Sequence, residues 1–214
     1  MKILRAILPC VALVAVTRAP LRAQSVVEEK GSIVFKSADG AGKQLTDSGR
    51  DFAPTLSPDG KWVAFIRATP GQTVATGAGD VEATELWLVG SGGEKPALLL
   101  RGHDAKDVKQ LIGGIMGAEF SLDGRQLYFF SAAWATSGAV HVIDLATKKE
   151  RFLTEGSSLE VVPNGDYKGH LLIQKHKYFL GGGSYDWYWL VGPDGKEVGP
   201  VGEDTENFKA TYVK

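Results

Sequence analysis

Short apolar runs separated by turn residues make up most of the chain. The clearest are residues 62–66 (Trp-Val-Ala-Phe-Ile), 86–89 (Leu-Trp-Leu-Val), 126–131 (Gln-Leu-Tyr-Phe-Phe-Ser) and 171–175 (Leu-Leu-Ile-Gln-Lys). Runs of this length, bounded by Gly, Pro, Asp or Ser, are typical of β-strands. An apolar pattern of helical period is almost absent. The pattern therefore predicts an all-β protein.

A turn motif recurs between these runs. Residues 57–60 read Ser-Pro-Asp-Gly, residues 121–124 read Ser-Leu-Asp-Gly, and residues 162–165 read Val-Pro-Asn-Gly as a weaker third copy. Asp-Gly and Asn-Gly tolerate the left-handed backbone of a tight turn, so each copy predicts a hairpin. The third copy follows the second after 41 positions, which matches the roughly 40 to 45 residues of a four-stranded propeller blade. The second follows the first after 64 positions, and two expected surface insertions, residues 69–82 and 104–116, account for the difference.

The first copy carries further matches to a known repeat. Residues 45–46 are Leu-Thr, Asp51 and Pro54 stand in an Asp-x-x-Pro spacing, and an apolar strand follows the turn. This resembles the repeat of TolB-type β-propellers, although Leu56 replaces the usual tryptophan and Leu122 replaces the proline in the second copy. The resemblance implies blades of four antiparallel strands arranged radially, in a TolB-like domain that spans residues 24–214.

The chain is short for a ring of such blades. It has residues for about four blades, which is near the lower limit for closure. A closed ring would need residues 33–36 to pair with a C-terminal strand such as residues 208–213. Otherwise the domain is an incomplete or open propeller, and a partner or a second copy of the chain would cover its strand edges.

The N-terminal segment has the features of a secretory signal peptide, assigned to residues 1–23. Lys2 and Arg5 precede an apolar run at residues 7–16, and small residues follow at 19–23. The apolar run is shorter than the roughly 20 residues that span a bilayer. We therefore expect a periplasmic or secreted protein without a stable membrane span after cleavage, an uncleaved membrane anchor being the alternative.

Removal of this segment changes the charge. The only cysteine, Cys10, lies in it, so the mature chain has no disulfide. Four of the 24 basic residues also lie in it, which leaves 20 against 25 acidic residues and a net charge near −5. No run of Lys or Arg remains that would neutralise several phosphates, so nucleic acid is not an expected partner.

One serine stands in a sequence that invites comparison with a hydrolase nucleophile. Ser184 follows three glycines and precedes Tyr185, as in the Gly-x-Ser-Tyr-Gly-Gly elbow of propeller-bearing prolyl oligopeptidases. However, Asp186 stands where that elbow needs a glycine, and the last histidine, His176, precedes the serine, whereas an α/β-hydrolase triad runs Ser, Asp, His. The segment is interpreted as a Gly-rich loop between strands, and no catalytic residue is assigned.

No cofactor or metal site is predicted either. The four histidines form no His-x-x-x-His or His-Glu-x-x-His pair, and only His103, beside Asp104 and Asp107, offers a mixed ligand set for a cation. An exposed loop with ordinary polar residues is the favoured interpretation of that group. The aspartates of the Asp-Gly turns, Asp59, Asp123 and Asp194, are explained by turn hydrogen bonds rather than by calcium.

Aromatic residues gather near the C-terminal end. The cluster is Tyr185, Trp187, Tyr188 and Trp189. On a strand, Trp187 and Trp189 face one way and Tyr188 the other, so one face could bind a peptide or a sugar. Packing between adjacent blades explains the cluster more simply. The candidate binding surface consists of Trp187, Trp189, Tyr185 and His103.

These observations favour an exported, non-catalytic β-propeller module that binds a protein or peptide partner in the cell envelope. The scaffold signature comes without a catalytic set of residues, and the two insertions offer binding loops. The alternative is a periplasmic hydrolase or lyase with its site in the propeller channel. A third hypothesis is a homo-oligomer in which a second copy completes the ring.

Overall fold

The computed structural model describes residues 23–214, so the predicted signal peptide lies outside the described residues except for its last position. The described part is all-β apart from one short helix. None of its helices is both long and apolar enough to cross a bilayer.

Four antiparallel sheets follow one another along the chain. The first contains β1 (Ser25–Glu29), β2 (Ser32–Lys36) and β3 (Gly42–Gln44). The second contains β4 (Asp51–Leu56), β5 (Trp62–Thr76), β6 (Gly79–Gly90) and β7 (Ala97–Arg101). The third contains β8 (Ile115–Phe120), β9 (Gln126–Ala132), β10 (Gly138–Asp144) and β11 (Glu150–Glu155). The fourth contains β12 (Glu160–Val161), β13 (Leu171–Tyr178), β14 (Ser184–Val191) and β15 (Glu197–Gly202), and helix α1 (Glu206–Tyr212) follows it.

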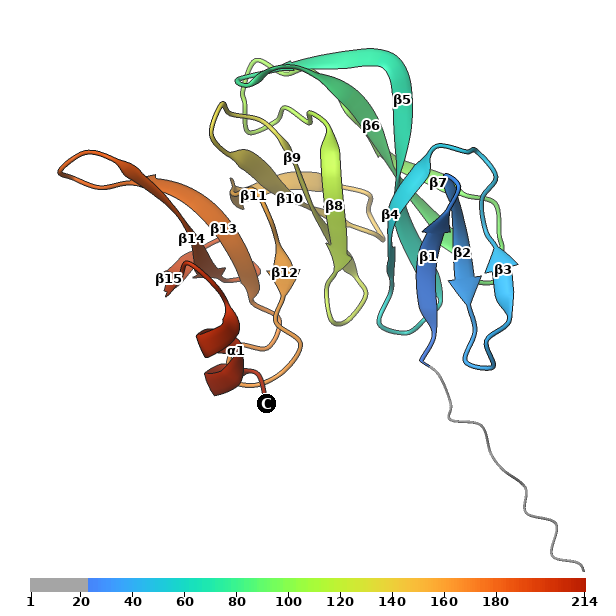
Figure 1. Ribbon diagram of the computed structural model, residues 1–214. Coiled ribbons are helices and arrows are strands. Elements are labelled where there is room, and N and C mark those ends of the chain that lie inside the picture. The colour runs from blue at the N-terminus through green and yellow to red at the C-terminus, as the bar shows by residue number, and fades with distance from the viewer. Residues whose placement is uncertain (1–22) are drawn as a thin grey trace, which may run out of the picture.

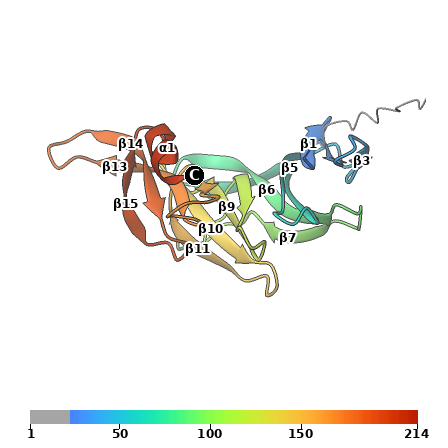
Figure 2. The same cartoon turned by 90° about the horizontal axis from the view of Figure 1, so that it is seen from below.

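The sheets stand side by side in an arc, with the first and last at opposite ends (Figures 1 and 2). Each pair of neighbours packs through apolar side chains. Phe35 of the first sheet meets Phe65 of the second, and Ile66 of the second belongs to one core cluster with Phe129 of the third. Val142 of the third sheet shares another cluster with Ile173 of the fourth. The prediction of about four antiparallel blades is therefore confirmed, and of the two arrangements considered, the sheets form the open one.

The pairing that would have closed a ring does not form. Residues 206–212 are helix α1 rather than a strand, and Phe208 belongs to a cluster with Leu172 and Leu190 on the last sheet. Phe208 and Tyr212 are four positions apart, which places them on one side of a helix and 5.2 Å apart between ring centroids. The helix thus covers part of the face that a following blade would have covered.

The first sheet ends the arc differently. Ile33 and Phe35 point toward the second sheet, so alternation along β2 turns Lys36 toward the outer face. There the Lys36 ammonium forms an ion pair of 2.7 Å with Glu29 of β1. The same alternation places Val27 and Val34 on this outer face, which is therefore mixed rather than wholly polar.

The recurrent turns have the same hydrogen bonds in their first two copies. The Ser57 hydroxyl donates to the Asp59 carboxylate at 2.7 Å and accepts the Trp62 N–H at 2.9 Å. Ser121, Asp123 and Gln126 repeat these contacts at 2.7 and 2.9 Å. Both aspartates also accept a backbone N–H from two residues further on. These bonds, led by the one from the serine hydroxyl, hold the pKa of each carboxyl below its ordinary value, which confirms turn chemistry as their role.

The prediction that residues 69–82 form a surface loop is wrong. Residues 69–82 continue β5 and β6 into a long hairpin, paired from Thr73↔Glu82 to Thr76↔Gly79. Val74 of this hairpin is buried with Leu111 of the loop that joins β7 to β8, and Asp104 of that loop accepts the Ala75 N–H at 2.9 Å. The two insertions therefore pack on each other, which gives the hairpin an apolar face to bury.

The second and third sheets each end in an outer strand that follows a turn. β7 pairs with β6, and β11 pairs with β10. In each case a short turn brings the strand back antiparallel to the one before it.

Candidate binding surface

The β13–β14 hairpin extends beyond the sheet that it belongs to. β12 pairs only with Leu171 and Leu172, and β15 pairs with β14 from Tyr188 to Val191. The pairing of β13 with β14 continues past both, as far as Tyr178↔Ser184. The hairpin thus projects from the end of the arc as a two-stranded ribbon (Figure 1, left). Two strands alone have free edges on both sides.

Large apolar side chains are exposed at the tip of this hairpin. Tyr178, Phe179 and Leu180 are consecutive, and their exposed fractions are 70%, 51% and 111%. They are three of the seven exposed large hydrophobic residues in the part of the chain that the structure describes. Contiguous exposed apolar side chains mark interaction sites on soluble proteins, whereas single ones do not.

One face of the hairpin carries a continuous row of rings, which we term the aromatic strip and define as Phe179, Tyr185 and Trp187. The ring centroids of Phe179 and Tyr185 are 4.7 Å apart, and those of Tyr185 and Trp187 are 4.8 Å apart. Tyr185 and Trp187 are half-buried. Their rings contact each other and Phe179 in a row, and part of each ring stays open to solvent.

Trp189 lies on the same face of β14 as Tyr185 and Trp187, but it contributes to packing between blades. It packs against the cluster of Val140 and Ile173 between the third and fourth sheets. The Lys177 ammonium lies 5.1 Å from its ring centroid, and its indole N–H is buried without a hydrogen-bond partner among residues 23–214. Trp189 therefore joins the aromatic strip to the core, and for this residue blade packing is confirmed.

A buried lysine holds the base of the hairpin. Lys175 is 2% exposed, and its ammonium donates to the Thr154 hydroxyl of β11 at 2.5 Å and to the Glu197 carboxylate of β15 at 2.8 Å. Lys177 donates to the same carboxylate at 3.0 Å. Burial would raise the pKa of Glu197, but the bonds from the two lysines outweigh it and hold that pKa below its ordinary value. The projecting ribbon is thus tied to two neighbouring strands.

The opposite face of the hairpin is polar at its base and aromatic at its tip. The Nδ1 atom of His176 lies 2.8 Å from a carboxylate oxygen of Asp186. The His176 ring stands edge-on to Tyr178 at 5.0 Å. Both faces of the tip therefore present aromatic surface.

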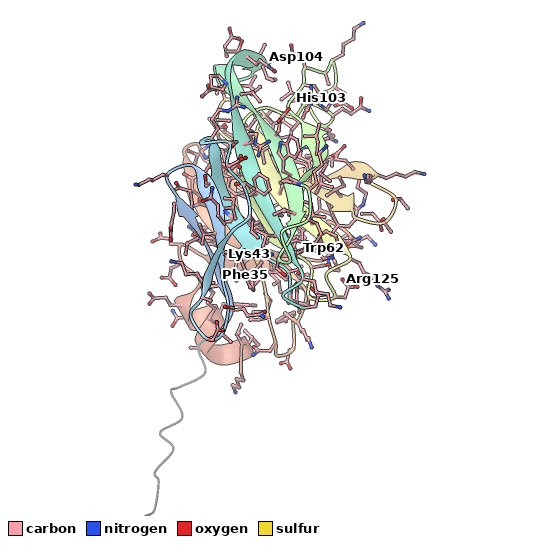
Figure 3. The ribbon with its side chains drawn as sticks, turned by 90° about the vertical axis from the view of Figure 1, so that its right-hand side faces the viewer. Phe35, Lys43, Trp62, His103, Asp104 and Arg125 are labelled. Atoms are coloured by element: carbon pink, nitrogen blue, oxygen red, sulfur yellow. The ribbon has the colours of Figure 1, made fainter. Side chains whose placement is uncertain are left out.

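His103, the fourth candidate residue, belongs to a different surface. It follows β7, forms a bridge with Ile112, and has its Nδ1 atom 3.0 Å from the Arg101 carbonyl oxygen. Figure 3 shows it near Asp104 at one end of the molecule. It lines a cavity of about 500 Å³ with residues that include Lys109 and Phe152. The candidate residues therefore divide into a hairpin set and a separate loop histidine.

The described residues contain no group of three His, Cys, Asp or Glu side chains placed to hold a metal ion. Ser184 lies at the end of a β-hairpin whose loop contains Gly182 and Gly183 with φ of 94° and 83°. This is the expected Gly-rich loop between strands and not a strand-to-helix elbow. The exposed tip residues Tyr178 to Leu180 were missed from the sequence, although their position just before the Gly-rich turn was a usable signal.

Neither a protein-family model nor a curated protein sequence matches this chain. Among solved structures it is similar to a putative TolB from Agrobacterium tumefaciens, with a TM-score of 0.56 and 15% identity over 85% of this chain and 58% of that one. It is also similar to the β-propeller domain of the Trilobed protease from Pyrococcus furiosus, with a TM-score of 0.52 and 17% identity over 78% of this chain and 48% of that one. The fold is that of a β-propeller.

A third similar structure is dipeptidyl peptidase 4 from Porphyromonas gingivalis, with a TM-score of 0.52 and 11% identity over 85% of this chain and 31% of that one. The chain thus spans between about a third and three fifths of these proteins. The likeness includes TolB-like and peptidase propellers alike, and at these identities it concerns the fold alone.

Proposed function

We propose that this protein is an exported, non-catalytic propeller module that binds a protein or peptide partner in the cell envelope through the β13–β14 hairpin. The observation that carries the proposal is the exposure of Tyr178, Phe179 and Leu180 at the tip, next to the aromatic strip. Aromatic residues are enriched where proteins meet and supply most of the binding energy at such contacts.

The open edges of the hairpin support a peptide-like partner. Past Gln174 on β13, where Ser157 and Ser158 still bond the edge, and past the reach of β15 on β14, each strand of the ribbon has one side without a neighbouring strand. An extended segment can add to such an edge through main-chain hydrogen bonds, while its side chains lie on the aromatic strip. The binding role therefore moves from the two insertions, which pack on each other, to this hairpin.

The test compares partner capture by two variants of the tagged protein after cross-linking in envelope extract. The double change Phe179→Ser and Leu180→Ser should lose the partner that the wild type retains. The matched control is Met116→Ser, since Met116 is an exposed apolar residue, at 48%, on β8 of another sheet. Equal retention by the tip variant and the wild type would refute the proposal.

Export rests on the N-terminal pattern and has its own test. Cleavage after Ala23 should leave a mature protein that begins at Gln24, which N-terminal sequencing of the exported product would detect. A product that keeps Met1 would contradict the prediction of a cleaved signal peptide.

The mass of the purified protein in solution tests the hypothesis that a second copy completes the open arc.

The alternative of a hydrolase or lyase gains no support from the geometry of residues 23–214. In that range no hydrogen bond joins a serine hydroxyl to a histidine ring, and Ser184 is the first residue of strand β14. Turnover of peptide, ester or glycoside substrates that a single Asp or His change abolishes would favour the enzyme instead.

A further inference from the structure

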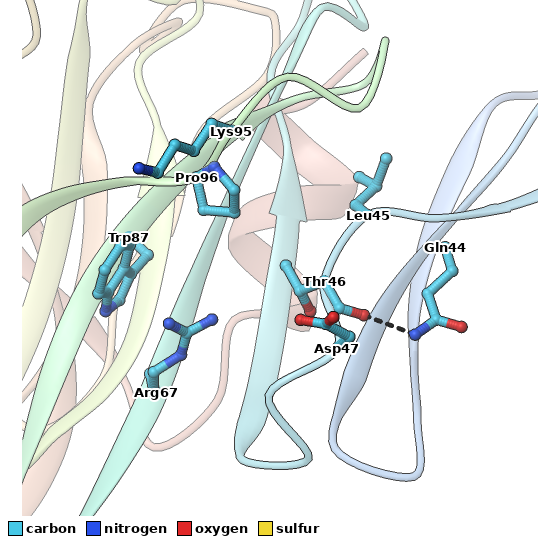
Figure 4. A pocket seen from close by; sticks show the side chains of 8 residues that line it. All are labelled: Gln44, Leu45, Thr46, Asp47, Arg67, Trp87, Lys95 and Pro96. Carbon is cyan, nitrogen blue, oxygen red and sulfur yellow. Dashed lines mark hydrogen bonds between the residues drawn. The ribbon is translucent and has the colours of Figure 1, made fainter.

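A second surface with defined polar chemistry lies between the first and second sheets. A cavity of about 510 Å³ opens there, within the range of small-molecule sites. Figure 4 shows Arg67 between Trp87 on one side and Thr46 and Asp47 on the other, with Lys95 and Pro96 above. None of these residues was a candidate from the sequence.

The Arg67 guanidinium is held rigidly at this cavity. Its Nε and Nη2 atoms donate to the two oxygens of Asp51, at 2.6 and 2.9 Å, and Asp51 is fully buried. The guanidinium carbon lies 4.4 Å from the Trp87 ring centroid. The Trp87 indole is fixed in turn, because its N–H donates to Glu85 at 2.9 Å. The cation is therefore in place before any ligand arrives.

Some N–H groups of the Arg67 guanidinium are not used by Asp51 and can bind a ligand. A guanidinium carries five N–H groups, and the fork to Asp51 uses one from Nε and one from Nη2. The Nη1 edge has no hydrogen bond to another side chain among the residues that the structure describes. Such an edge matches a carboxylate, and the exposed Lys95 ammonium on the cavity wall adds a second positive charge.

The opposite wall has the reverse polarity. Asp47 presents a carboxylate there, while Trp87 and Pro96 provide apolar surface. Since Asp51 neutralises Arg67 in large part, the cavity is dipolar rather than uniformly positive. Its complement is a group with a carboxylate at one end, an N–H donor at the other and an apolar side chain between them.

We propose that this cavity binds a free carboxylate attached to an apolar residue whose nitrogen is acylated, as in the last residue of a peptide or in a free N-acyl amino acid. The carboxylate lies against Arg67 and Lys95, the amide N–H donates to Asp47, and the apolar side chain contacts Trp87 and Pro96. This site is separate from the hairpin surface and does not depend on it.

The test titrates N-acetyl-L-phenylalanine into the protein and follows backbone amide shifts by NMR. The shifts should saturate and be centred on Thr46, Asp47 and Lys95. N-acetyl-L-phenylalaninamide differs only in the carboxylate and should bind at least about tenfold more weakly, because it loses a charge-assisted hydrogen bond. Equal binding of the acid and the amide, or no saturable shift with either, would overturn the proposal.

A variant separates the cavity from general electrostatics. Lys95→Gln should weaken binding of the acid about threefold or more, whereas Lys61→Gln, which removes an exposed lysine of the β4–β5 turn, should leave it unchanged. Equal effects of the two changes would also overturn the proposal. Acetyl-Gly-Gly-Phe distinguishes the two sources: tighter binding than the single residue indicates a peptide C-terminus, and weaker binding indicates a free N-acyl amino acid.

Discussion

The pair formed by Asp51 and Arg67 offers the sharpest test of how this fold is stabilised. Asp51 is fully buried and Arg67 is 16% exposed, and two hydrogen bonds join them. Asp51→Asn removes the negative charge and leaves the guanidinium without its counter-ion. Breaking a buried pair in this way costs about 3–5 kcal/mol. That is a large part of the roughly 5–15 kcal/mol that stabilises a typical domain.

The assay is urea unfolding at pH 7, monitored by tryptophan fluorescence and by circular dichroism. The Asp51→Asn variant should show a free energy of unfolding lower by about 3 kcal/mol with an unchanged slope. Glu29→Gln is the control, because it removes an exposed ion pair with Lys36. Its cost should be below about 1 kcal/mol. A loss below about 1 kcal/mol in Asp51→Asn would refute the reasoning.

The double change Asp51→Asn and Arg67→Met separates the charge from the packing. Replacing both members of a buried pair by less polar side chains is often neutral or stabilising. The double variant should therefore recover most of the stability that the single change loses. If the double variant is as unstable as the sum of the two single variants, the pair is not the unit that stabilises this site.

The same pair has a pH dependence of known sign. Burial would raise the pKa of Asp51, but hydrogen bonds from Arg67, Thr46 and Ser48 outweigh it, so the folded-state pKa lies below the ordinary value of 3.8. Its contribution is complete above that ordinary value and is lost as the pH falls through the folded value. The difference in stability between the wild type and Asp51→Asn should therefore shrink below about pH 4. A difference that is constant from pH 7 to pH 2 would contradict this.

Three further changes have defined outcomes. Gly31→Ala should lower the free energy of unfolding by more than about 2 kcal/mol, because φ is 72° and the new Cβ would press on the Gly49 backbone; an unchanged melting temperature would contradict this. Gly124→Ala has a φ of 70°, but the new Cβ would make only an ordinary contact, 3.9 Å from Pro58 Cδ, so it should cost only about 1 kcal/mol in the same thermal assay. Burial raises the pKa of Glu119, so the folded protein loses stability as the pH rises through the folded-state pKa of this carboxyl and the buried group ionises. Glu119→Gln keeps an acceptor for the Val161 N–H and should be more stable than the wild type at pH 7 but not at pH 4, by urea unfolding.

The features that the sequence determined by itself are local ones. The Ser-x-Asp-Gly turns form as expected because the serine hydroxyl, the aspartate carboxylate and the glycine backbone lie within five residues of one another. The apolar runs beside these turns form strands because their composition and length are also local properties of the sequence. The all-β class and the four blades follow from strands and turns together. The aromatic residues of β14 were also recognisable as a surface, since alternation along one strand decides which of them share a face.

What only the tertiary structure decided depends on residues far apart in the chain. Residues 69–82 pair as a hairpin because Val74 is buried against Leu111. Residues 206–212 form a helix with Phe208 packed on Leu172 and Leu190, where their apolar residues alone also suited a strand. The cavity at Arg67 needs the β3–β4 connection to lie against β5 and β6. A contact between distant segments leaves no pattern in either segment alone, so such features could be found only in the folded chain.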